Sequence, residues 1–135
     1  MHLRTDRQGR PLTFRLTAGQ RHEATQAQAL LEQGAVTPRG RGHPRLRPQR
    51  VCADKGYSSR AFRQYLRQHG IEVVIPRKRT ERRRGLFDEG AYRERHRIEQ
   101  CFNRLKQFRR IATRDEKLAC HYLAMLTIAC IVLWL

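Results

Sequence analysis

Two short apolar segments separated by one amphipathic segment restrict the fold more than any other feature of the sequence. Arg50–Asp54 and Ile71–Ile75 both have the length of buried strands. Between them, Ser58 or Ser59 is placed to cap a helix over Ala61–His69. Because two strands of one sheet that are joined through a helix run parallel, this region predicts a strand–helix–strand unit in an α/β domain.

The flanking segments extend this α/β pattern. Apolar and polar side chains alternate over residues 2–5 and 11–17, around a turn signal that begins at Asp6 and ends at Gly9, which predicts a β-hairpin. The element order predicts an α/β fold with one mixed sheet, containing an antiparallel pair and parallel crossovers, flanked by helices. The other helices are expected over Ala24–Gln33, about Ala91–Arg110 and about Glu116–Leu135.

The strongly basic composition indicates an anionic polymer as the partner. Lys and Arg number 29 against 12 Asp and Glu, which gives a formal net charge of +17. Such side chains displace counterions from phosphates and so supply the sequence-independent part of nucleic-acid affinity. Two basic runs, Arg39–Arg50 and Arg77–Arg84, are expected to be loops. A merely soluble basic protein, or a coding bias toward Arg, also explains the composition. The charge indicates the partner and says nothing about the chemistry.

The cysteines and the apolar C-terminus argue against a zinc site and a membrane span. Cys52, Cys101, Cys120 and Cys130 form no C-x-x-C pair, so we expect them to be buried thiols in a reducing cytoplasm. No signal-peptide pattern follows Met1. The run Leu118–Leu135 contains His121 and Tyr122, and a buried helix is therefore expected there rather than a membrane span.

The helix expected after Ala91 carries a line of polar side chains beside an apolar stripe. At about 100° per residue, the polar line consists of Tyr92, Arg95, Glu99 and Lys106. One interpretation is that Arg95 and Glu99 form a surface ion pair one turn apart and that Lys106 is a solvated charge. The other is that the line borders a cleft.

The spacing of these four residues resembles the Tyr-Arg-Glu-Lys signature of bacterial insertion-sequence transposases of the DDE type. Other segments resemble the same family in the same order. They are Met1–Asp6, Gly9–Leu12, Thr17–His22, Ala53–Tyr57, Ile98–Lys106 and Arg109–Arg110. The resemblance therefore covers nearly the whole chain.

This resemblance implies an RNase H-like fold in which two Asp and one Glu bind two Mg²⁺ ions. Asp54 matches the second aspartate and Glu99 the glutamate, so both are implied as catalytic and metal-binding residues; taken alone, Asp54 also suits a turn or cap at a strand end. Carboxylate oxygens suit Mg²⁺, and paired ions stabilise both oxygens of a phosphodiester displacement. The partner implied is DNA, at insertion-sequence ends and targets. The DNA-binding residues implied are Lys55, Tyr92, Arg95, Lys106, Arg109 and Arg110, and the two basic runs would hold flanking DNA.

Asp6 is expected to be a turn residue, because in the family's layout its hairpin follows the strand that bears the first aspartate. The first strand and the first metal ligand are then expected to be missing, so that residues 1–135 form an N-terminally truncated catalytic domain. Such a chain should be inactive alone and should need the upstream part of the transposase or another copy. The alternative is a non-catalytic, basic DNA-binding remnant that regulates intact transposase.

Overall fold

The computed structural model describes residues 1–17, 23–36, 40–81, 85–114 and 116–135. Most of the family-like segment Thr17–His22 and parts of both basic runs, at 39 and 82–84, lie outside the described residues. The elements are β1 (His2–Thr5), β2 (Pro11–Arg15), α1 (Glu23–Leu31), β3 (Arg50–Cys52), the 3₁₀ helix η1 (Lys55–Tyr57), α2 (Arg60–Gln68), β4 (Glu72–Val74), α3 (Glu89–Arg93), α4 (His96–Lys106), α5 (Arg109–Thr113) and α6 (Ala119–Val132).

β1 and β2 form the predicted antiparallel hairpin. The Asp6 carboxylate accepts hydrogen bonds from the backbone N–H groups of Gln8 at 2.9 Å and Arg10 at 2.8 Å. Gly9, at φ +79°, closes the turn by donating its N–H to the Asp6 carbonyl at 3.1 Å. A side chain at residue 9 would be strained at this angle. The turn role predicted for Asp6 is therefore confirmed.

β3, α2 and β4 form the predicted strand–helix–strand unit. The two strands are parallel, with Val51 opposite Val73. Ser59 caps α2 by accepting the N–H of Phe62 at 3.1 Å, as a serine before a helix is suited to do. Phe62 and Leu66, on the buried face of α2, pack in the core against these strands.

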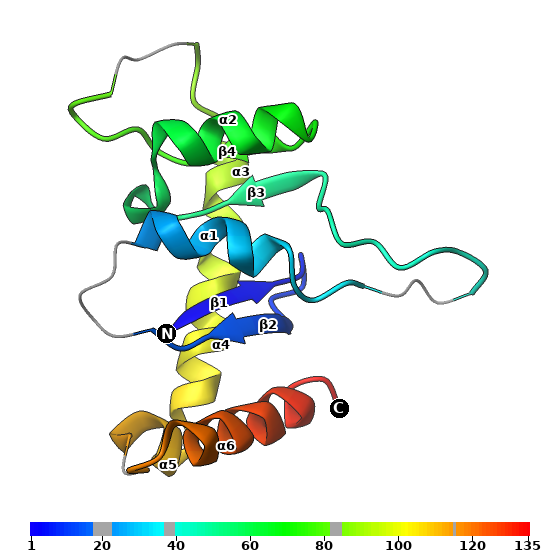
Figure 1. The fold of residues 1–135 in the computed structure, drawn as a ribbon, viewed down its shortest axis with the longest axis vertical. Helices are drawn as coiled ribbons and strands as arrows, with labels where there is room; N and C mark the ends of the chain where they lie inside the picture. The colour runs from blue at the N-terminus through cyan, green and yellow to red at the C-terminus, as the bar shows by residue number, and fades with distance from the viewer. Residues whose placement is uncertain (18–22, 37–39, 82–84, 115) are drawn as a thin grey trace.

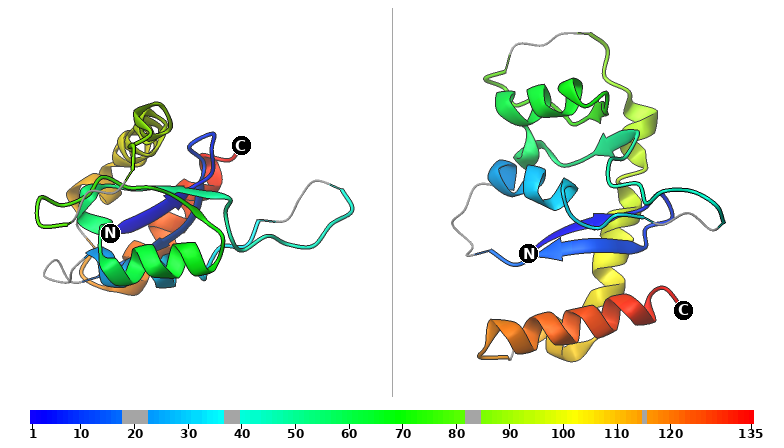
Figure 2. Two further views of the ribbon diagram at one scale, coloured as in Figure 1. Left: turned by 90° about the horizontal axis from the view of Figure 1, so that it is seen from above. Right: turned by 45° about the vertical axis from the view of Figure 1, so that its right-hand side comes forward.

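The strands form two separate sheets, so the expectation of one continuous mixed sheet is wrong for the described residues. β1 pairs with β2 and β3 with β4, and no described pairing joins the two sheets. Figures 1 and 2 show β1 and β3 as the inner strands, with α1 and α2 on one side of the strand layer and α3 and α4 on the other. The connection between the halves is instead made by helices and side chains. His2, for example, lies 2.7 Å from the Tyr57 hydroxyl.

The single helix expected over Ala91–Arg110 is divided into α3, α4 and the start of α5. At the first break the hairpin turn packs against the helix: Arg7 pairs with Glu94 at 3.1 Å, and the Arg97 guanidinium donates to the Arg7 carbonyl. At the second break Phe108 adopts an extended backbone and packs on the core. Contacts with distant segments therefore lie at both breaks, and helix propensity does not register such contacts.

α6 lies at one end of the molecule (Figure 1), and the expectation that it is a buried helix is wrong in extent. Ile128 and Ile131 are 56% and 55% exposed, because only one side of α6 meets the rest of the chain. The buried side chains of α6 are Leu126, Ala129 and Cys130. None of the helices in the described ranges is long and apolar enough to cross a membrane.

All four cysteines are free thiols. Cys101 and Cys130 are buried as expected, but Cys52 is half-buried and Cys120 is exposed. Burial raises the pKa of the Cys130 thiol to about 11 and also raises the pKa of Cys101. The expectation of four buried cysteines is therefore correct for two of them.

Candidate active site

Three of the four signature residues lie together where α3 passes into α4. The Arg95 guanidinium is 2.5 Å from the Glu99 carboxylate, and its central carbon is 5.5 Å from the centre of the Tyr92 ring. His96 lies 3.6 Å from the second oxygen of Glu99. These residues and Arg93 line an open depression on the surface. The ion pair that the sequence allowed is present, and it lies in a hollow.

Lys106 lies apart from this cluster, which we call the Tyr92–Arg95–Glu99 cluster. It is seven residues beyond Glu99 in α4, which places it about 10 Å further along the helix axis. There it lines a different pocket together with Met1, Phe102 and Tyr122. The polar line expected from one continuous helix is therefore divided between two hollows.

Asp54 lies at the start of η1, two residues after β3 ends. One of its carboxylate oxygens accepts the backbone N–H of Lys55 at 2.5 Å, and both side chains are exposed. Just before it, the Cys52 thiol donates to the Ala91 carbonyl at 3.5 Å, so β3 packs against α3. Among the described residues, no hydrogen bond or ion pair links Asp54 to the Tyr92–Arg95–Glu99 cluster.

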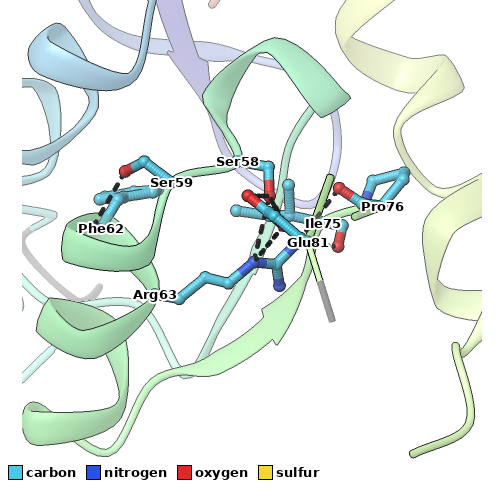
Figure 3. A network of polar contacts seen from close by, with 7 residues as sticks. All are labelled: Ser58, Ser59, Phe62, Arg63, Ile75, Pro76 and Glu81. Atoms are coloured by element: carbon cyan, nitrogen blue, oxygen red, sulfur yellow. Dashed lines mark hydrogen bonds and ion pairs between the residues drawn. The ribbon is translucent and has the colours of Figure 1, made fainter. Parts of the chain in front are cut away.

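A buried polar network supports the segment that follows Asp54 in the chain (Figure 3). The sequence analysis did not predict this network. The Ser58 hydroxyl donates to the Glu81 carboxylate at 2.7 Å and accepts from the Arg63 guanidinium at 2.8 Å. Arg63 also donates to the carbonyls of Ile75 at 2.8 Å and Pro76 at 3.1 Å. The network thus fixes the end of η1 to α2 and to the chain that leaves β4.

The network contains a cation, Arg63, and an anion, Glu81, which form an ion pair. Burial lowers the pKa of Arg63. Burial also acts to raise the pKa of Glu81, but the Ser58 hydrogen bond and the Arg63 charge outweigh it and lower that pKa overall. The sequence contained one signal for the network, because Arg63 stands between apolar positions on the buried face of α2, where an unpaired charge is costly.

Arg109 and Arg110 lie at the far end of α4, on α5. Arg110 is 3.5 Å from Glu116, and the Arg109 carbonyl accepts the Thr113 hydroxyl at 2.8 Å. Both arginines are exposed. They therefore lie on the Lys106 side of the molecule, away from the Tyr92–Arg95–Glu99 cluster.

The described residues do not by themselves form a metal site. Carboxylates such as Asp54 and Glu99 have the donor chemistry that Mg²⁺ prefers. However, the described ranges contain no group of three His, Cys, Asp or Glu side chains that could hold a metal ion. In addition, Arg95 and His96 lie against the Glu99 oxygens.

Residues 1–134 match the family model of the transposase DDE domain. The chain belongs to the DDE transposase domain family. It is 40% identical over 136 residues to a relative named as a transposase of insertion sequence element IS402 (Burkholderia cepacia), a match that covers 98% of this chain and 61% of that protein. It is 31% identical over 137 residues to one named for IS6501 (Brucella ovis), covering 100% and 96%. This DDE-family chain thus spans only part of the IS402 relative, and no solved structure matches it significantly.

Proposed function

We propose that this chain is the part of an insertion-sequence transposase catalytic domain that supplies Asp54 and Glu99, two of the three carboxylates that hold Mg²⁺ during DNA strand cleavage and joining. The observation that carries the proposal is the packing of β3 on α3. Because Cys52 donates to the Ala91 carbonyl, the strand that leads to Asp54 reaches the helix pair that bears Glu99. Both carboxylates are exposed to solvent and hence to a DNA substrate.

In this proposal Arg95 holds Glu99 until DNA arrives. A guanidinium binds carboxylates and phosphates with the same planar geometry, so a DNA phosphate can replace the Glu99 carboxylate at Arg95. That exchange frees Glu99 at the moment when the substrate is in place. Tyr92, whose ring lies beside Arg95, stacks on the end of the DNA strand. The flanking DNA backbone is bound by Lys55, Lys106, Arg109 and Arg110.

We further propose that the two small sheets are parts of one RNase H-like sheet. A further strand between β1 and β3 would pair with both inner edges and bring the third carboxylate. Sheet edges leave N–H and C=O groups unpaired, and these are the groups such a strand would satisfy. The strand would come from an upstream part of the transposase or from another copy, and residues 1–135 alone should be inactive.

A non-catalytic DNA-binding role is the second candidate. The observation that favours it is the ion pair between Arg95 and Glu99, in which the guanidinium lies against the carboxylate that a metal ion would need. A chain of formal net charge +17 in this state would still bind DNA. It would then act by occupying the DNA of intact transposase or by joining its oligomers.

The decisive experiment measures Mg²⁺-dependent cleavage and joining of element-end duplex DNA, by the chain alone and by the chain fused to the upstream segment. The variants are Asp54→Asn and Glu99→Gln, and Glu32→Gln is the matched control because Glu32 is an exposed carboxylate elsewhere. We expect activity only in the fusion, lost in both site variants and kept in the control. Activity that survives either site variant refutes the site. Inactivity of every protein, with salt-sensitive DNA binding, supports the second candidate.

A further inference from the structure

We propose that residues 40–47 form an arm that inserts Arg41 into the minor groove of A·T-rich duplex DNA. The inference deepens the proposed function, on which it rests for DNA as the partner, by naming the part of the DNA that is read. The arm projects from the body between α1 and β3, and Figures 1 and 2 show it extending away from both sheets. Every residue from Gly40 to Arg45 is exposed.

The base of the arm is firmly held. Val36 and Arg45 exchange backbone hydrogen bonds of 2.9 and 2.8 Å, which closes the arm at its root. The half-buried Arg4 guanidinium donates to the Gln33 carbonyl at 2.8 Å and to the Leu46 carbonyl at 2.9 Å. Both sides of the root are therefore attached to the β1 strand that carries Arg4. An arm with a fixed root loses less freedom on binding than a free loop does.

The composition of the tip suits entry into a narrow groove. Arg41 stands between Gly40 and Gly42, which have no side chains to collide with the groove walls. Gly40 has φ +112°, an angle that disfavours any other residue, and a side-chain carbon there would meet nothing within 4 Å. The glycine is thus required by the path of the chain. Arg41 lies four residues from the root at Arg45, so it can reach at most about 14 Å from the root. The minor groove is about 7.5 Å deep and 6 Å wide, so this reach is sufficient to enter it.

The charges of the arm suit the minor groove better than a general phosphate surface. From Gln33 to Ala53 the sequence has five Arg, no Lys and no acidic residue. Arg41, Arg45 and Arg47 are exposed, and no side-chain hydrogen bond or ion pair joins them to another described residue. A·T-rich sequences narrow the minor groove and deepen its negative potential, which attracts inserted Arg. Guanidinium is less strongly hydrated than ammonium, which favours Arg over Lys in such a site.

The test compares binding of the full chain to three duplexes by fluorescence anisotropy. One duplex is A·T-rich, one is G·C-rich, and in the third inosine replaces guanosine. Inosine lacks the amino group of guanine in the minor groove, so the third duplex resembles A·T there and G·C in the major groove. We expect the A·T and inosine duplexes to bind at least about fivefold more tightly than the G·C duplex.

Two variants distinguish the insertion of Arg41 into the groove from the general effect of positive charge on DNA binding. Arg41→Lys keeps the charge and should reduce the preference to less than about twofold. The matched control is Arg79→Ala, which removes an exposed arginine from another loop and should weaken binding to all three duplexes equally. Equal affinities, an inosine duplex that binds like G·C, or a preference that survives in Arg41→Lys overturns the arm while leaving DNA as the partner. Failure to bind any duplex overturns both the arm and the proposed function.

Discussion

Replacing Arg63 with methionine should destabilise the chain strongly although the volume of the side chain changes little. Arg63 is 6% exposed and joins three parts of the chain through Ser58, Glu81 and the carbonyls that follow β4. Methionine fills much of the same space with apolar atoms and donates no hydrogen bond. The substitution therefore leaves the partners of Arg63 in place and takes away only their donor.

The size of the effect follows from what remains buried. The Ile75 carbonyl, on a residue that is 1% exposed, loses its donor, which costs about 1–3 kcal/mol. Glu81 loses the cation 3.5 Å away, but its side chain is 20% exposed and partly regains water. Removing one partner of a buried ion pair costs about 3–5 kcal/mol, and the exposure of Glu81 favours the lower end. We expect a loss of about 3 kcal/mol, or roughly 10 °C in Tm.

Urea unfolding followed by far-ultraviolet circular dichroism measures this loss directly. Arg67→Met is the matched control, because Arg67 is exposed one turn further along the same helix and should change stability by no more than about 0.5 kcal/mol. Arg63→Lys should fall between the two, since one ammonium cannot replace the forked guanidinium. A loss below about 1 kcal/mol for Arg63→Met, or an equal loss in the control, would refute the assignment of the network as a buried support.

Three further outcomes are expected. Folding lowers the pKa of Glu81, so the contribution of its carboxylate to the free energy of unfolding is complete above the unfolded value near 4.3 and is lost as pH falls through the folded pKa. The difference in stability between the wild-type protein and Glu81→Gln should therefore shrink from pH 7 to pH 4. A difference that stays constant over this range contradicts the prediction. Alkylation at neutral pH, mapped by mass spectrometry, should modify the exposed Cys120 well before the buried Cys130, whose pKa is about 11; equal rates would exclude the packing of α6. Trp134→Phe should cost about 1 kcal/mol in urea unfolding, since the indole N–H donates to the Pro11 carbonyl at 2.7 Å, and an unchanged midpoint would show that this contact does not hold.

Local patterns predicted the elements whose stability is local. The hairpin, the β3–α2–β4 unit and the Ser59 cap lie within a few residues of their expected positions, because alternation, turn residues and caps act over short distances. The same holds for Asp6, whose carboxylate satisfies its own turn. The ion pair between Arg95 and Glu99 was also an alternative that helical spacing alone allowed.

Contacts between distant segments account for what the sequence did not predict. The break between α3 and α4 arises where the turn at Arg7 meets Glu94, 87 residues further along the chain. The division into two sheets depends on pairing partners that no local pattern specifies. Arg63 was unrecognised because its partners lie outside α2, at the end of η1 and in the chain that leaves β4. In the candidate site, the seven-residue spacing of Glu99 and Lys106 already placed them two turns apart, but which hollow each residue lines depends on contacts with distant segments.

Because Arg4 anchors the root of the arm, the direction of the arm and its length are determined by different residues. Three main-chain carbonyls converge on this one guanidinium, at Leu31, Gln33 and Leu46, so the direction of the root is set by β1. The length of the arm depends instead on the number of residues between Val36 and Arg45, which pair at its root. Lengthening a loop costs little free energy. Related chains could therefore change arm length, and with it the spacing of the DNA they contact, without rebuilding the domain that carries it.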